Sequence, residues 1–301
     1  MNTKHLSLHN PFLGLLVLAM FAFSCGNETP KNQEIEEPIE EKDPNSTQLM
    51  EIDGKVFSIP SPIQTAILIK NVGSNYNKEI LNEPSKLASY STNFKKAINL
   101  GIYGADLGYV TLYDQTQDAI SFLTAVKSIA DDLGVSSAFD IELVERFEMN
   151  IGNQDSLLVL VSDAYKASDR FLKGNEQNNI GSLILAGGWI ESLYFAVNTA
   201  EMTGNKDVIT RIAEQKTTVI NLIKLLTPYY SKPEYTVLIN DLIELNKTYE
   251  QIEFSYTFVA PTVDEENKTT TINSTTVVNI SDEQLKTISE KIAKIRAEIV
   301  S

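Results

Sequence analysis

Residues 180–197 read Ile-Gly-Ser-Leu-Ile-Leu-Ala-Gly-Gly-Trp-Ile-Glu-Ser-Leu-Tyr-Phe-Ala-Val and contain the chain's one tryptophan, Trp189. Two adjacent glycines inside a helix cost about 1 kcal/mol each relative to alanine. Close approach by another helix would offset that cost, and so would room for a ligand. Glu191 interrupts the apolar run, which argues against a membrane span. We therefore predict a buried helix at 177–203.

A second helix, predicted within 85–113, carries small residues that suit such close packing. These are Gly101, Gly104, Ala105 and Gly108. We predict that the two helices form the central pair of a bundle. The alternative is a ligand pocket between them, lined by Trp189, Tyr103 and Tyr109.

Both apolar helices also contain an acidic residue, Glu191 in one and Asp106 in the other. A buried carboxylate needs a hydrogen-bonding or charged partner. We expect that partner to be a serine (Ser182 or Ser192), a tyrosine or a lysine. The alternative is a glycosidase-like pair of catalytic acids, which would need an open cleft.

Helical periodicity continues over most of the chain. The expected helices are 61–72, 85–113 (broken near Ser91), 115–133, 138–150, 154–173, 177–203, 206–226, 233–252 and 281–300. Gly134, Gly174 and Gly204 each follow a periodic run, as glycines that terminate helices do. The sequence thus predicts a mainly α fold, a bundle of about eight or nine helices.

The last predicted helix begins with a capping-box pattern, Ser281 followed by Gln284. Its apolar residues recur at alternating spacings of three and four; they are Leu285, Ile288, Ile292, Ile295 and Ile299. Such a narrow stripe buries one edge of a helix. We predict a terminal helix packed on the bundle, with a coiled-coil or partner surface as the alternative.

Residues 253–280 break the helical pattern. Two runs rich in aromatic and β-branched residues flank an acidic turn at 264–268, which is typical of a β-hairpin. Because an isolated hairpin is marginally stable, we expect it to pair with the β-like residues 49–59 or to lie against the helices.

The first residues resemble the signal peptide of a bacterial lipoprotein. Lys4 precedes an apolar run at 11–23 that is too short to span a bilayer. The run ends in Ala-Phe-Ser-Cys, which resembles a lipobox. By that resemblance residues 1–24 are removed, and Cys25 is lipidated and anchors the protein in a membrane. The alternative is a plain secretory signal with an incidental cysteine.

Residues 25–48 are expected to form an acidic, disordered tether behind the lipidated cysteine, and 49–301 a single helical domain. Three prolines and an excess of acids keep the tether extended. Gly26 follows the cysteine where aspartate retains enteric lipoproteins at the inner membrane. The resemblance therefore implies an outer-membrane lipoprotein of the cell envelope, on the periplasmic face or the cell surface.

Histidine usage limits the chemistry further. The chain's two histidines, His5 and His9, both lie in the predicted signal peptide, and Cys25 is the one cysteine. A mature chain without histidine or free thiol lacks the usual catalytic triads, the usual zinc, copper and iron ligands, and the axial ligands of haem. We predict neither metal nor cofactor. The formal charge of −15 argues against binding to nucleic acid.

The Trp189 region and the stretch Tyr-Gly-Ala-Asp-Leu at 103–107 resemble uncharacterised all-helical lipoproteins of Bacteroidota, over about residues 60–250. That resemblance implies no activity. We therefore expect a membrane-tethered, non-catalytic protein that binds an envelope protein or a small ligand. The alternative is a carboxylate-dependent enzyme acting on glycans, with Glu191 and Asp106 as its acids.

Overall fold

The computed structural model describes residues 48–52, 55–136, 177–264 and 268–301, with a few residues between 145 and 163, and side chains from residue 60 onward. Cys25, the signal peptide and the tether lie outside the described residues. So do Gly174 and most of the two helices predicted at 138–150 and 154–173.

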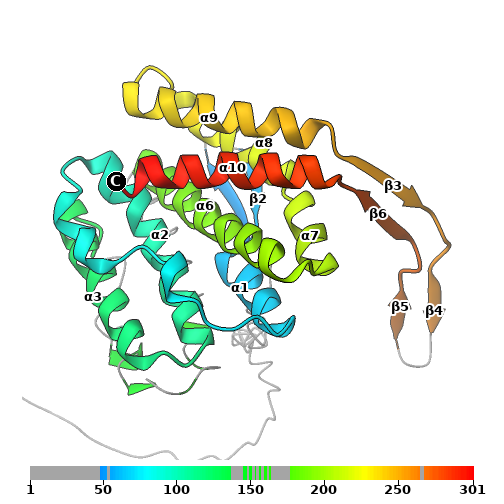
Figure 1. Cartoon of the computed structure of the whole chain (residues 1–301), viewed down its shortest axis with the longest axis horizontal. Coiled ribbons are helices and arrows are strands. Elements are labelled where there is room, and N and C mark those ends of the chain that lie inside the picture. The colour runs from blue at the N-terminus through cyan, green and yellow to red at the C-terminus, as the bar shows by residue number, and fades with distance from the viewer. Residues whose placement is uncertain are drawn as a thin grey trace, which may run out of the picture. The chain divides into compact units, whose positions relative to one another are not determined.

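The described residues form a mainly α bundle, as predicted (Figure 1). Its α-helices are α1 Pro62–Asn71, α2 Asn93–Leu112, α3 Thr116–Leu133, α6 Asn178–Thr203, α7 Lys206–Ala213, α8 Lys216–Leu226, α9 Pro233–Glu250 and α10 Asp282–Ile299. Short 3₁₀ helices lie at η1 Lys78–Ile80, η2 Pro84–Ser89 and η4 Thr227–Tyr229. The predicted break near Ser91 separates η2 from α2.

Helices α2 and α6 form the central pair, and two glycines set how closely they approach. A Cβ added to Gly101 would meet the backbone of α6, 2.8 Å from the nitrogen of Gly188 and closer still to the carbonyl oxygen of Ile184. A Cβ on Gly187 would meet the carbonyl group of Ile98 in α2 in the same way. The structure thus confirms the predicted pairing, because the two backbones touch where side chains would separate them.

Helix α6 is apolar around most of its circumference. Among the described helices it alone is long and apolar enough to cross a membrane, yet 89% of its apolar window is buried inside the protein. Neighbouring helices cover it on several sides, with α2, α1, α7 and α10 in contact with it. Its composition is therefore that of a central core helix.

The prediction of one helix over 206–226 is wrong, because the chain turns at Glu214 and Gln215 and forms α7 and α8 instead. At this turn the side chain of Gln215 donates to the carbonyl of Arg211 and accepts from the indole of Trp189. These two hydrogen bonds fix the turn against α6 and end the helix there. Sequence periodicity runs through the turn because α7 and α8 both bury one side on the same core.

Helix ends follow the predicted chemistry at several places. Gly134 and Gly204 adopt left-handed backbone conformations, with φ of +69° and +60°, directly after α3 and α6. Ser281 and Gln284 form the predicted capping box at the start of α10.

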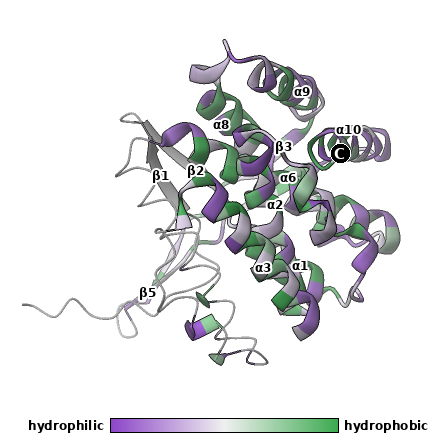
Figure 2. Cartoon of the chain, turned by 90° about the vertical axis from the view of Figure 1, so that its left-hand side faces the viewer, coloured by the Kyte–Doolittle hydropathy of each residue, from purple (hydrophilic) through white to green (hydrophobic). Residues whose placement is uncertain are grey.

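Helix α10 packs on α6 and α9, as a terminal helix on the bundle was predicted to do. Its buried side chains include Ile288, Ile292, Ile295 and Ile299. In Figure 2 the hydrophobic side of α10 faces the other helices, and its hydrophilic side faces outward.

The predicted hairpin forms. The expected pairing with 49–59 is wrong, and among the described residues contact with the helical core is limited to the base of the hairpin, at Val278 and Ile280. Strand β3 (Glu253–Thr257) pairs with β6 (Thr275–Asn279), and β4 (Thr262–Asp264) pairs with β5 (Thr269–Thr271). Residues 48–59 form a separate hairpin of β1 (Gln48–Ile52) and β2 (Lys55–Ile59). We call residues 253–279 the arm. Its strands are almost wholly exposed and extend away from the helices (Figure 1).

Candidate functional site

An ion pair between Arg296 of α10 and Glu191 of α6 lies inside the bundle. The Nε and Nη2 atoms of Arg296 donate to the two carboxylate oxygens of Glu191 at 2.6 and 2.7 Å. Nη2 also donates to the carbonyl oxygen of Ile80 at 2.8 Å, and the guanidinium lies 4.3 Å from the ring centre of Tyr194. Although burial disfavours the charged guanidinium, Glu191 raises the pKa of Arg296 above its ordinary value. This bidentate geometry makes the pair strong and specific.

Asp106 of α2 adds a second carboxyl group to this pair. Burial raises the pKa of Asp106 well above its ordinary value, and the neighbouring Glu191 raises it further, against the opposing effect of Arg296. The Oδ2 atom accepts from the backbone N–H of Asn82 at 3.3 Å, while no donor among the described residues reaches Oδ1. A proton on Asp106 would let it donate to the Glu191 side chain. With one guanidinium, one carboxylate and one neutral carboxyl group, the buried cluster then has no net charge.

The 3₁₀ segments between α1 and α2 cover this charged cluster. The side-chain amide of Asn82 donates to Tyr90 and to Asn99 at 3.0 and 3.2 Å. Asn99 in turn donates to the carbonyl oxygen of Ile299 at 3.2 Å. Polar groups of α2, of α10 and of the segment between η1 and η2 are thus joined in one buried network. Both Glu191 and Asp106 are fully buried.

This burial decides what Glu191 and Asp106 can do chemically. A glycosidase acid pair must reach both its substrate and water, and neither carboxyl group is accessible in this fold. The structure brings the two predicted acids together, but as a structural ion-pair cluster that joins three helices. The glycan-enzyme alternative therefore has no acid pair at these two positions.

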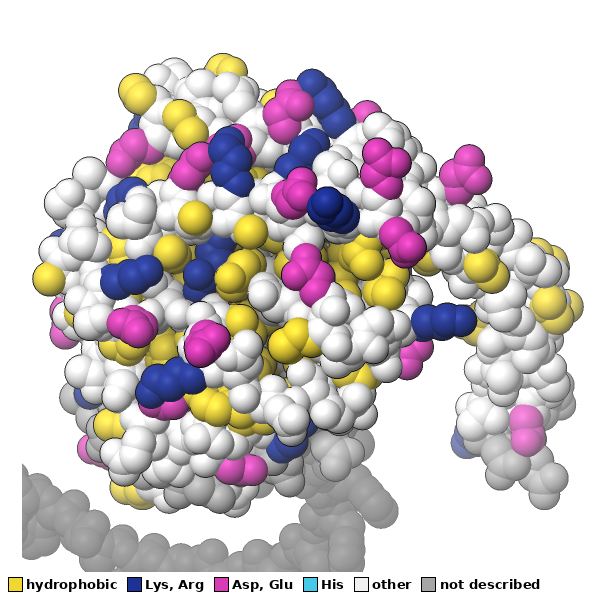
Figure 3. All heavy atoms as spheres, viewed as in Figure 1, with side chains coloured by type: hydrophobic (Ala, Val, Ile, Leu, Met, Phe, Trp, Pro, Cys, Tyr) yellow, Lys and Arg dark blue, Asp and Glu magenta, His cyan; other side chains and the backbone are white. Residues whose placement is uncertain are grey.

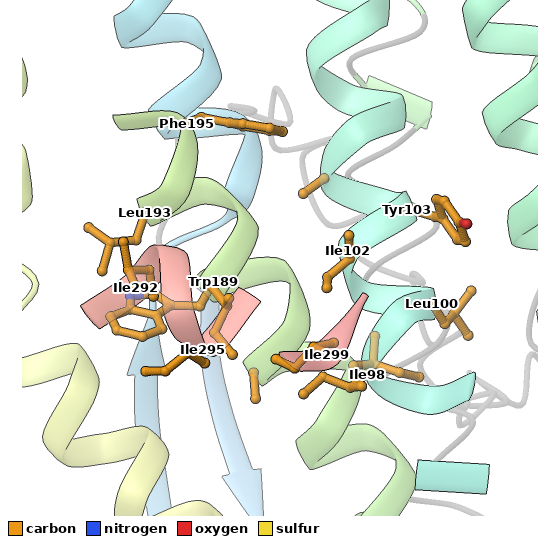
Figure 4. Close-up of a cluster of buried hydrophobic side chains, with 14 of the residues drawn as sticks. Ile98, Leu100, Ile102, Tyr103, Trp189, Leu193, Phe195, Ile292, Ile295 and Ile299 are labelled. Carbon is orange, nitrogen blue, oxygen red and sulfur yellow. The ribbon is translucent and has the colours of Figure 1, made fainter. Parts of the chain in front are cut away.

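Trp189 faces a different part of the core. Its indole N–H donates to the Oε1 atom of Gln215 at 3.0 Å. The cavity beside it measures about 10 Å³, which is the space of one water molecule. In Figure 4 Trp189 projects from α6, whereas Tyr103 projects from the far side of α2. A drug-sized ligand occupies hundreds of Å³, so this site holds no such ligand in the described fold.

The two tyrosines of the predicted pocket are also core residues. The hydroxyl of Tyr103 donates to the carbonyl oxygen of Glu83 at 3.0 Å, and that of Tyr109 accepts from the backbone N–H of Asn77 at 3.1 Å. Burial raises the pKa of Tyr103 and of Tyr109 above the ordinary phenol value. Both hydroxyls therefore hold the segment between α1 and α2 in place.

A larger hollow of about 200 Å³ opens between α2, α9 and α10. Phe94, Leu238 and Ile295 line its apolar part, and charged side chains surround it. Its volume is below the usual range of ligand pockets, about 300–1,000 Å³. Among the described residues, no three His, Cys, Asp or Glu side chains are grouped so that they could hold a metal ion.

The arm is the most unusual surface of the described protein. Its exposed apolar residues include Phe254, Tyr256, Phe258, Val259, Val263, Ile272 and Val277. Phe258 is 71% exposed and Ile272 is 78% exposed. Figure 3 shows hydrophobic side chains at several places along the arm, with charged side chains near its tip. A two-stranded ribbon with apolar side chains in solvent has the properties of a binding element.

Sequence reasoning missed Arg296 as the partner of Glu191, and expected serine, tyrosine or lysine. A signal was present. Arg296 lies four residues after Ile292 and three before Ile299, so it shares the apolar face of α10. A lone arginine inside a buried stripe indicates a buried acid opposite it.

Comparisons of the chain with protein-family models, with curated proteins and with solved structures found no match. No relative therefore supplies an activity for this chain.

Proposed function

We propose that this protein is a non-catalytic binding protein of the cell envelope, anchored to the outer membrane through a lipid on Cys25. The arm carries the proposal. It presents large apolar side chains to solvent, among them Tyr256 and Phe258, and the protein's own core does not cover them. Contact with a partner would bury these side chains and stabilise the arm.

The chemistry of the remaining residues supports binding over catalysis. The two acids best placed to form a catalytic pair are fully buried, and Glu191 is ion-paired with Arg296. Burial also raises the pKa of Asp106. The lipobox-like residues before Cys25 support a tether at the membrane surface.

Cell fractionation tests the anchor. We expect the full chain to stay with the membrane fraction and Cys25→Ala to move to the soluble fraction, because the thiol is the site of lipidation. Ser24→Ala is the matched control, since it keeps a small residue before the cysteine and should stay with the membrane. If Cys25→Ala remains in the membrane fraction, the anchor is wrong.

Affinity purification from the native envelope tests the arm. The bait is the tagged full chain, expressed beside an untagged copy, and every co-purified protein is counted, including that copy. We expect Tyr256→Ser with Phe258→Ser to lower recovery at least fivefold, because apolar contact area is lost. The control pair, Tyr230→Ser with Met202→Ser, removes exposed apolar side chains outside the arm. Equal recovery from both pairs would refute binding through the arm.

A further inference from the structure

The β3–β6 ribbon of the arm has two different faces. Residues opposite each other in an antiparallel pair lie on the same face. Phe254 pairs with Val278 and Tyr256 pairs with Thr276, so these four residues share one face, which is mainly apolar. The other face carries Glu253, Ser255, Thr257, Thr275, Val277 and Asn279. The ribbon is therefore amphipathic. Val278, at the base of the arm, packs against the core, whereas Tyr256 further out is 65% exposed.

The outer edge of β6 lacks the features that protect edge strands. Natural edge strands are guarded by lysines, prolines, bulges or inward-pointing charges. Strand β6 reads Thr-Thr-Val-Val-Asn, and the longer stretch 269–281 contains neither charge nor proline. Its backbone pairs with β3 on one side, which leaves the other edge open to a further strand.

Charge restricts what can approach this edge. The chain carries a formal charge of −15, so two copies repel each other over most of their surfaces. Strand β6 carries no charged side chain, so two copies can meet along it with less of that repulsion.

Strand β6 is also complementary to itself. In an antiparallel pairing centred on Val277, Val277 faces its own counterpart and Thr276 faces Val278 of the second copy. This register places Thr276 and Val278 of both copies on one face. The two apolar faces around Tyr256 then join into one, across four strands. Four strands with an apolar face reach the stability that two strands lack.

We propose that the arm binds a second copy of this chain, through antiparallel pairing of β6 with β6 about a twofold axis. The contact is isologous, since each copy contributes the same strand. The inference rests on the proposed function, in which the arm is the binding element, and it names the partner.

Site-specific photo-crosslinking in the native envelope tests the pairing. A benzophenone amino acid replaces Thr275 on β6 of the full chain, or Val237 on α9 as the control position. We expect an adduct of two copies from position 275 and none from position 237, with its composition read by mass spectrometry of its peptides.

Charge substitutions at Val277, made in the position-275 chain, test the register. In a homodimer Val277→Lys places two lysines opposite each other, and like charges there weaken pairing by about fivefold. Val277→Glu should act in the same way. Mixed Val277→Lys and Val277→Glu chains should restore the adduct. The matched control is Val237→Lys, because Val237 is 57% exposed and Val277 is 55% exposed.

The outcomes separate this inference from the proposed function. An adduct with a different protein would overturn the self-pairing but leave the arm as a binding element. A two-copy adduct that Val277→Lys leaves unchanged would overturn the β6 contact. Absence of any adduct at position 275 would overturn the inference, and equal recovery in the affinity experiment would refute the proposed function as well.

Discussion

Replacing Gly101 with alanine should destabilise the bundle at its centre. The added methyl group would lie 2.8 Å from the nitrogen of Gly188 and closer to the carbonyl oxygen of Ile184. Both atoms belong to the backbone of α6, so no flexible side chain can move aside. Helices α2 and α6 would have to separate by about 1 Å or more to restore ordinary contact.

The magnitude follows from two destabilising effects and one stabilising effect. Overpacking a core costs about 1–3 kcal/mol and occasionally more, and a rigid backbone contact belongs at the upper end. A gap of about 1 Å also forfeits up to half of the dispersion energy of each contact across the pair. Alanine regains about 1 kcal/mol of helix propensity. We therefore expect Gly101→Ala to lower the free energy of unfolding by a net 2–4 kcal/mol, by the same overpacking argument.

Denaturant unfolding followed by circular dichroism measures this change. Gly134→Ala is the control. A Cβ there has open space around it, and only the left-handed backbone is strained, at a cost of about 1 kcal/mol. Gly187→Ala should match Gly101→Ala, and the double variant should cost less than the sum because one separation relieves both contacts. If Gly101→Ala costs no more than Gly134→Ala, the close-approach reasoning is wrong.

Three further predictions concern buried polar groups. Glu191→Gln and Arg296→Met should each cost about 3–5 kcal/mol of stability, and the double variant should cost less than their sum. If the losses of unfolding free energy simply add in the double variant, the ion pair is contradicted. Because the pKa of Asp106 is raised in the folded state, the folded protein keeps a proton that the unfolded chain loses. The contribution of Asp106 to stability should therefore fall as pH rises from about 4 toward the raised folded-state value, so wild type should lose stability relative to Asp106→Asn in unfolding curves recorded from pH 4 to 7. Fluorescence of Trp189 should resist quenching by acrylamide in the folded protein, and Gln215→Leu should cost about 1–3 kcal/mol by leaving the indole N–H unpaired; ready quenching would favour an open pocket instead.

The central pair of helices could be predicted because glycine has a specific cost. Closer packing of a neighbouring helix offsets the helix propensity lost at Gly101 and Gly187. The small residues of α2 allowed the sequence to predict which helix that neighbour is. Caps were predictable for a related reason. Ser281 and Gln284 act within one turn, so their roles depend on local sequence alone.

The partner of Glu191 and the support of the arm depend on distant residues, and sequence periodicity does not report distance. Glu191 and Arg296 are 105 positions apart, and a stripe on α10 identifies a buried face without naming what lies opposite. The expectation that the hairpin would find support rested on the rarity of isolated ribbons. The burial of Trp189 against Gln215 depends on a turn between α7 and α8 that the continuous apolar pattern conceals.

The sequence separation of Glu191 and Arg296 also orders the events of synthesis. During translation Glu191 leaves the ribosome 105 residues before its guanidinium partner. Closing α2 over α6 in that interval would bury an uncompensated acid, at a cost of several kcal/mol. We therefore expect the nascent chain to stay unfolded until α10 emerges. A chain that we propose is exported benefits from that delay, because an unfolded polypeptide can still be threaded through a secretion channel.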